Sequence, residues 1–217
     1  MAKYPGLLIT FEGGEGGGKT TQSVRLRDRL TKAGEDVVLL REPGGTVISE
    51  QIREVLLSTK NTGMAFTTEV LLFQAARAQI YREIVIPSLT AGKVVLMDRS
   101  RDSSVVYQGM ARGFGKDLIE ELNDLSTKEI YPDKTFLLDL PVEVGLKRRS
   151  DTDKNDRLDM EAKEFHQTVR QSYLEWVKDC SSNRWEIIDA TQNLEAVEEE
   201  IWEKIQPILA EHKRNEA

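Results

Sequence analysis

A glycine-rich segment near the N-terminus carries residue types that bind phosphate. Residues 13–20 read GGEGGGKT and fit the spacing G-x-x-x-x-G-K-[ST]. Glycines let the main chain turn several N–H groups toward an anion, and the start of a following helix adds its positive end. Lys19 would reach the β- and γ-phosphates, and the Thr20 hydroxyl would hold the Mg²⁺ that bridges them. The segment is therefore interpreted as a P-loop that binds a nucleoside triphosphate.

Other sequence features indicate which class of P-loop protein this is. The sequence has no N-K-x-D tetrapeptide of the type that reads guanine. Asp98 follows four apolar residues and Asp139 follows three, but neither is followed by the glutamate with which many ATPases activate water. Asp98 is followed by Arg99 instead. Because the same cradle serves many functions, these features only favour a kinase of a nucleotide or small metabolite.

Short apolar runs in the sequence predict the strands that must position this phosphate-binding loop. Runs of the type found in buried parallel strands stand at 7–11, 37–40, 94–97, 135–138 and 185–188. Between them lie segments with helical spacing, such as the apolar positions Phe165, Val169, Tyr173 and Trp176. Strands that alternate with helices predict a parallel sheet covered on both faces. The fold class is therefore α/β.

Length and composition limit the alternatives. The chain has 217 residues, with 30 Lys and Arg against 37 Asp and Glu, a net charge of −7. This acidic balance argues against binding of a nucleic-acid polymer, which requires a basic surface. The first apolar run is far shorter than the roughly 20 residues that span a bilayer, so no membrane segment is expected. A single cysteine, Cys180, cannot form an internal disulfide, which favours a cytoplasmic protein with an inert, buried thiol.

Five motifs in order resemble the thymidylate kinase family along nearly the whole chain. They are FEGGEGGGKTTQ at 11–22, REPGGT at 41–46, LLFQAAR at 71–77, DRSRDSSVVYQGMARG at 98–113 and RLD at 157–159. The resemblance implies a single P-loop NTPase domain over 1–217, with three α/β/α layers, a five-stranded parallel sheet and a short lid at about 148–159. It implies transfer of the γ-phosphoryl group of ATP to dTMP, giving dTDP and ADP for dTTP synthesis. Mg²⁺ accompanies ATP, and the family is usually homodimeric.

The resemblance also assigns residues to each substrate. Those assigned to ATP are Gly13, Gly14, Glu15, Gly16, Gly17, Gly18, Lys19, Thr20 and Thr21. Those assigned to dTMP are Glu15, Glu42, Arg53, Phe73, Arg77, Arg99, Ser103, Ser104, Tyr107 and Gln108. Among the latter, the three arginines would hold the phosphate, since guanidinium groups bind phosphate bidentately. Phe73 would stack on thymine, and Tyr107 would crowd the sugar 2′ position.

The resemblance further predicts where a catalytic arginine resides. Family members carry it either within the P-loop or on the lid, and here the P-loop has Gly16 at the relevant position. The lid type found in bacteria is therefore expected, with Arg148 and Arg157 preferred over Arg149. Lys19, Asp98 and Arg99 complete the expected catalytic set. The chain departs from the family at Ser100, where an aromatic is common.

Two other functions compete with this interpretation. The first is a kinase for another nucleoside or nucleotide, such as dUMP or a deoxynucleoside, on the same scaffold. The second is a regulatory protein that binds a nucleotide and catalyses nothing. Intact Lys19, Thr20, Asp98 and Arg99 argue against the second.

Overall fold

The centre of the molecule is a parallel sheet. A computed structural model describes residues 4–151, 156–180 and 183–216. Its five strands lie in the order β2-β3-β1-β4-β5, and every neighbouring pair is parallel. The strands are β1 (Leu7–Glu12), β2 (Val37–Arg41), β3 (Val94–Asp98), β4 (Lys134–Asp139) and β5 (Trp185–Asp189). All five apolar runs are therefore strands, and the predicted α/β class with a five-stranded parallel sheet is confirmed.

Burial explains why the central strands have no polar alternation. Every residue of β1 and β3 is buried, so both faces of these strands require apolar side chains. Ile9 and Leu96 belong to a core on one face, with Leu30 of α1 and Ile201 of α9. Leu8 and Val95 belong to a second core on the other face. Helices on both sides are the physical requirement for a sheet of this kind.

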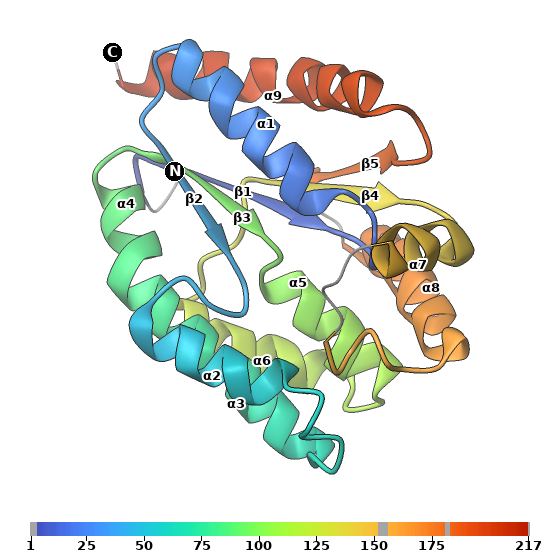
Figure 1. Cartoon of the computed structure of the whole chain (residues 1–217). Coiled ribbons are helices and arrows are strands. Elements are labelled where there is room, and N and C mark those ends of the chain that lie inside the picture. Colours follow the sequence, from blue (N-terminus) through green and yellow to red (C-terminus); the bar gives the residue numbers. More distant parts are fainter. Residues whose placement is uncertain (1–3, 152–155, 181–182, 217) are drawn as a thin grey trace.

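The helices form the two outer layers. In Figure 1, α1 and α9 cover one face of the sheet, while α2, α3, α4, α6 and α8 lie on the opposite side. The helices in chain order are α1 (Lys19–Lys32), α2 (Val47–Leu57), α3 (Phe66–Ile80), α4 (Ile86–Thr90), α5 (Arg101–Ser104), α6 (Lys116–Thr127), α7 (Val142–Ser150), α8 (Lys163–Asp179) and α9 (Leu194–Glu216). Two π-helical segments, η1 (Tyr81–Val85) and η2 (Val105–Ala111), continue α3 and α5. In the part of the chain that the structure describes, no helix combines the length and apolarity needed to cross a membrane.

Two expectations need correction. The polar segment 148–159 does not begin as a loop, because residues 148–150 form the last turn of α7. Residues 152–155 of the expected lid lie outside the described residues. Cys180 follows α8 directly and is half-buried rather than buried, although partial burial raises the pKa of its thiol.

Candidate active site

The P-loop connects β1 to α1 at the carboxyl edge of the sheet. Lys19, the first residue of α1, folds back so that its Nζ donates to the carbonyl oxygens of Gly14 at 2.7 Å and Gly13 at 3.1 Å. The loop thus surrounds the buried lysine ammonium, at the positive end of a 14-residue helix. Ligands of open parallel sheets bind at this carboxyl edge. The geometry is that of an anion-binding cradle.

One glycine of the loop is required by a close approach to α7. Gly16 has φ +69°, and a Cβ on it would lie 2.1 Å from the Gly145 carbonyl oxygen. Conversely, a Cβ on Gly145 would lie 2.2 Å from the Glu15 carbonyl oxygen. The two backbones touch because neither residue has a side chain. No arginine fits at position 16 in this arrangement, which gives a physical reason for the glycine found there.

Oxygen donors meet beside the P-loop. The Thr20 hydroxyl donates a hydrogen bond to the Asp98 carboxylate, which ends β3. A hydroxyl and a carboxylate next to a phosphate cradle are hard ligands of the kind Mg²⁺ prefers, and Mg²⁺ commonly combines one or two such groups with substrate phosphates and water. The donor set of these two residues fits the predicted metal.

Arg99 joins the end of β3 to the P-loop. Its backbone is in the left-handed region at φ 66°, directing the side chain back across the sheet edge. Its guanidinium donates to Glu15 at 2.6 Å, to the Gly13 carbonyl at 3.0 Å and to the Tyr107 hydroxyl at 3.1 Å. Burial alone would raise the pKa of Glu15, but Arg99 and Lys19 outweigh it and lower that pKa to about 2. Glu15 is therefore a fixed negative charge, and three predicted dTMP residues are in contact.

Sequence reasoning missed Glu12, which holds this constellation together. The wholly buried carboxylate accepts hydrogen bonds from the Ser100 backbone at 2.9 Å, the Tyr173 hydroxyl at 2.8 Å and the Ser103 hydroxyl at 2.5 Å. Burial and the nearby Asp102 raise the pKa of Glu12 to about 7. The signal in the sequence was a charged residue, Glu12, at the end of a largely apolar strand.

The Arg77 side chain, expected from the sequence to bind a phosphate, is not free to do so; it is buried and hydrogen-bonded to the protein. It is 1% exposed, and its guanidinium donates to Glu42 at 2.8 Å, Ser104 at 2.9 Å, Asn123 at 2.8 Å and the Ser100 carbonyl at 3.0 Å. The second Nη also lies 2.7 Å from Glu42. Its N–H groups are thus taken up by protein oxygens, so Arg77 forms part of the cavity wall.

A continuous cleft joins the P-loop to these acceptor residues. It encloses about 2850 Å³, counting space open to solvent. All ten residues predicted for dTMP line it, together with Lys19, Asp98 and Arg148 and the P-loop from Glu15 to Thr21. In this lining, Arg53 donates to the carbonyl of Pro43, which follows the cis Glu42–Pro43 peptide bond, at 2.6 Å. The structure therefore gathers residues from all five motifs around one space.

The three lid arginines take different positions. Arg148 and Arg149, in the last turn of α7, line the cleft. Arg148 donates to the Ala190 carbonyl at 3.0 Å, and Arg149 pairs with Asp159 at 2.7 Å. Arg157 does not line the cleft: it is 6% exposed, and its guanidinium donates to the Leu56 carbonyl at 2.9 Å and to Glu69 at 2.6 Å.

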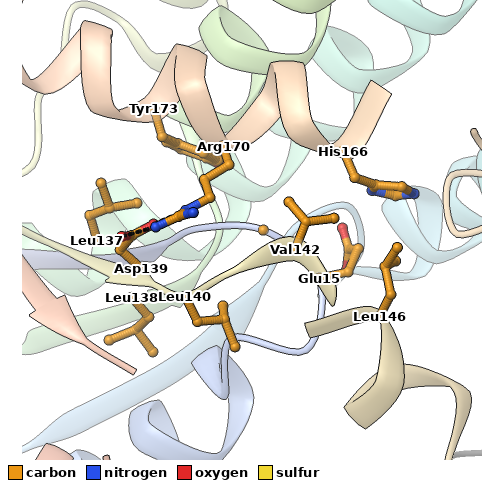
Figure 2. Close-up of a pocket in the computed structure, with 11 residues that line it drawn as sticks. Glu15, Leu137, Leu138, Asp139, Leu140, Val142, Leu146, His166, Arg170 and Tyr173 are labelled. Atoms are coloured by element: carbon orange, nitrogen blue, oxygen red, sulfur yellow. Dashed lines mark hydrogen bonds and ion pairs between the residues drawn. The ribbon is translucent and has the colours of Figure 1, made fainter. Parts of the chain in front are cut away.

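A smaller cavity of about 370 Å³ lies behind the P-loop. Figure 2 shows Glu15 with Val142 and Leu146 of α7 on one side of it, and His166, Arg170 and Tyr173 of α8 along another. Its lining is mostly apolar, and Arg170 in that lining donates a pair of hydrogen bonds to Asp139 at 2.8 and 2.9 Å. The cavity shares Gly14 and Glu15 with the P-loop but holds none of the predicted acceptor arginines.

Comparisons with known proteins agree with this geometry. A family model described as thymidylate kinase matches residues 11–201. The thymidylate kinase of Geotalea uraniireducens (strain Rf4) is 46% identical over 212 residues, 95% of this chain and 99% of that protein. The thymidylate kinase of Latilactobacillus sakei subsp. sakei (strain 23K) is 48% identical over 195 residues, 88% of this chain and 91% of that protein.

The fold is also similar to that of a solved thymidylate kinase structure. The crystal structure of thymidylate kinase from Ehrlichia chaffeensis aligns with a TM-score of 0.76 at 34% identity, covering 93% of this chain and 99% of that chain. The sequence motifs, the cleft and these similarities agree. The chain belongs to the thymidylate kinase family, which comprises ATP-dependent kinases of a nucleoside monophosphate.

Proposed function

We propose that this protein transfers the γ-phosphoryl group of ATP to dTMP, yielding dTDP and ADP for dTTP synthesis. The observation that carries the proposal is that one cleft is lined both by the P-loop and by Arg53, Phe73 and Arg99. One space lined by a triphosphate cradle and by a separate set of cations and an aromatic suits two nucleotides bound together. Membership of the thymidylate kinase family supports thymine as the acceptor base.

The ATP side uses the P-loop backbone and Lys19 for the phosphates. Thr20 and Asp98 would hold Mg²⁺, which withdraws negative charge from the β- and γ-phosphates when bound. Because the Thr20 hydroxyl already donates to Asp98, these two oxygens are in place before ATP binds. Lys19 must exchange its bonds to Gly13 and Gly14 for bonds to phosphate.

On the acceptor side we assign the dTMP phosphate to Arg99 and Arg53 and place Arg77 in the wall of the base pocket. Phe73, one turn before Arg77 on α3, is assigned to stack on thymine. Ser103, Ser104 and Gln108 are assigned to polar contacts with the nucleoside.

The sugar is assigned to acidic and aromatic groups near the P-loop. Tyr107 donates to Glu15 at 2.9 Å, so the two side chains form one rigid surface. Tyr107 would exclude a 2′-hydroxyl, and Glu15 would accept from the 3′-hydroxyl. The Oε1 atom of the buried Glu42 has no hydrogen-bond partner within the described residues, and burial raises the pKa of this carboxyl.

The chemistry requires alignment more than proton transfer. The attacking oxygen belongs to a phosphate monoester, whose second pKa is about 6, so it is largely anionic at neutral pH. No general base is needed. Lys19 and arginines stabilise the charge that spreads over the transferred group in a loose transition state. We assign the lid contribution to Arg148 and Arg149, because these two side chains line the cleft and Arg157 does not.

A coupled assay of ADP release tests the proposal directly. The enzyme is given ATP and Mg²⁺ with dTMP, dUMP, dCMP or thymidine as acceptor. We expect dTMP to have the highest kcat/KM. Equal turnover of all four acceptors would refute thymine specificity, and tight ATP binding without any turnover would favour a regulatory protein.

We further propose a homodimer located in the cytosol. Apolar side chains are exposed along the paired helices α2 and α3, including Val47, Ile48 and Leu71. Leu71 lies in the middle of α3. A lone cysteine suits a reducing compartment.

A further inference from the structure

A buried carboxylate on α3 contacts both the nucleoside side of the cleft and the lid segment. Glu69 lies in the first turn of α3 and is fully buried. Its Oε1 accepts a hydrogen bond from Nε2 of Gln108 at 2.9 Å. Its Oε2 accepts from Arg157 at 2.6 Å and from Arg112 at 3.5 Å. Glu69 itself is not among the residues that line the cleft.

The charge of Glu69 fixes which way the Gln108 amide points. Glu69 forms ion pairs with two guanidinium groups, and a carboxylate has acceptors and no donor. Only the amide NH₂ of Gln108 can face such a group. The carbonyl Oε1 is then directed away from Glu69, and Gln108 lines the cleft. Among the hydrogen bonds of residues 4–151, 156–180 and 183–216, this carbonyl has no protein partner.

The arrangement is rigid. Arg112 is 6% exposed on its side chain, donates to Glu161 at 2.5 Å and has its guanidinium over Phe66 at 4.3 Å and Phe165 at 4.4 Å. Arg157 is anchored a second time by the Leu56 carbonyl. Both cations are therefore anchored independently of Glu69, although the buried Nε of Arg112 has no hydrogen-bond partner within the described residues.

An acceptor at this position selects among pyrimidines. Thymine carries a hydrogen on N3 and can donate to a carbonyl, whereas N3 of cytosine is itself an acceptor and would face the same carbonyl with a lone pair. We propose that Glu69 is a specificity-determining residue that never touches substrate: it locks Gln108 with its carbonyl toward the base and so favours thymine over cytosine. The inference rests on the proposed function, in which Gln108 contacts the base.

The inference also explains the position of Arg157. This residue was expected to reach the transferred phosphate, yet it faces Glu69. In the proposed arrangement Arg157 holds the Glu69 carboxylate in place through their ion pair at 2.6 Å, and so acts as a positioning residue. The lid segment and the base pocket are thereby joined through one carboxylate.

The test is the ratio of kcat/KM for dTMP to kcat/KM for dCMP in the full-length enzyme. In Glu69→Gln the new amide can donate as well as accept, so Gln108 is free to flip. We expect the ratio to fall roughly 10- to 100-fold, the effect of losing one oriented hydrogen bond in a buried site. Most of the change should come from kcat/KM for dTMP.

Two more variants separate orientation from stability. In the double variant Glu69→Gln, Gln108→Glu the carboxylate moves to position 108, where it again presents an acceptor to the base, so the ratio should recover. Gln108→Met removes the acceptor and leaves Glu69 in place, and it should lower the ratio even if Glu69→Gln fails to fold. Asp102→Asn is the matched control, because Asp102 is fully buried and paired with Arg184 at 2.6 Å but lies outside the cleft. Its variant should lose stability and keep the ratio.

The outcomes distinguish the two proposals. If the wild-type enzyme does not prefer dTMP to dCMP, the proposed function itself is wrong. If the wild type prefers dTMP and both Glu69→Gln and Gln108→Met keep that preference, the function stands and the role of Glu69 is overturned. If Asp102→Asn lowers the ratio as much as Glu69→Gln does, the effect reflects general loosening and the inference is likewise overturned.

Discussion

Lys19 and Glu15 show how much one buried site changes the chemistry of single residues. Burial and the neighbouring Arg99 lower the pKa of the Lys19 ammonium to about 8, from an ordinary value of 10.5. Glu15, which shares the same surroundings, stays ionised because Arg99, Lys19 and the hydrogen bond from Tyr107 together outweigh the cost of burial. The two residues are separated by three glycines, so the difference arises from what each charge meets.

The first prediction concerns the pH dependence of ATP use. A lowered pKa means that free enzyme loses the Lys19 charge as pH rises through about 8, so the attraction for triphosphate weakens above that value. We expect kcat/KM for ATP to fall above about pH 8, since this parameter reports groups of the free enzyme. Steady-state rates from pH 6 to 10 measure the profile. In Lys19→Arg, which stays charged throughout, the fall near pH 8 should vanish; its persistence would place the titrating group elsewhere.

At the scale of elements, α7 combines two tasks. Its first half packs backbone to backbone on the P-loop through Gly145, and its last turn presents Arg148 and Arg149 to the cleft. A movement of α7 therefore affects the ATP cradle and the lid arginines together. The contact of Gly16 with Gly145 is the point at which this coupling is tightest.

The second prediction tests that contact. In Gly145→Ala the new Cβ would lie 2.2 Å from the main-chain carbonyl oxygen of Glu15 in the P-loop. Because the contact is with backbone, rotation of a side chain cannot relieve it. We expect a stability loss of about 1–3 kcal/mol, typical of overpacking, and at least a tenfold lower kcat/KM for ATP. Thermal unfolding and initial rates measure both. Gly63→Ala is the control, because its Cβ meets nothing within 4 Å and its φ is not positive, so it should behave as wild type.

The third prediction concerns the last turn of α7. Charge supplied to the transferred phosphoryl group acts mainly in the transition state, so Arg148→Ala and Arg149→Ala should lower kcat while KM for dTMP changes little. For at least one of the two we expect a loss of roughly 100-fold, in line with removal of one oriented donor from such a site. Arg157→Ala should instead act on stability and base preference. A large kcat loss confined to Arg157→Ala would restore Arg157 as the catalytic arginine.

At the scale of the whole molecule, helices α2 and α3 lie on the opposite side of the sheet from α1 and α9 (Figure 1), and both carry exposed apolar side chains. Leu71 is 56% exposed in the middle of α3, and the same helix carries Phe73 to the cleft. A dimer formed through this surface would therefore pack against the helix that carries Phe73 to the acceptor pocket.

The fourth prediction follows for the oligomeric state. Leu71→Asp places a charge in the proposed interface and should shift the protein from dimer to monomer in sedimentation equilibrium at micromolar concentration. Ile187→Asp is the control, because Ile187 is similarly exposed, at 48%, on the edge strand β5. It should leave the dimer intact. A wild-type protein that sediments as a monomer would contradict the proposal.

The sequence alone determined the parallel sheet, the P-loop and the family. Fully buried strands require continuous apolar runs, and phosphate binding by main-chain N–H groups requires glycines at fixed spacing, so both leave a local record in the chain. Helix boundaries near the lid were less readable, because the last turn of α7 is polar and its helical state depends on packing of the preceding residues against the P-loop.

Only the tertiary structure decided which partner each charge meets. Arg77, Arg99 and Arg157 look alike in a sequence, yet Arg77 is bound to Glu42, Arg99 to Glu15 and Arg157 to Glu69. These contacts join residues 35 to 88 positions apart. The energy of a buried charge depends on its neighbours in space, and local sequence does not record those neighbours. For that reason the roles of Glu12 and Glu69 became visible only once the strands and helices were assembled.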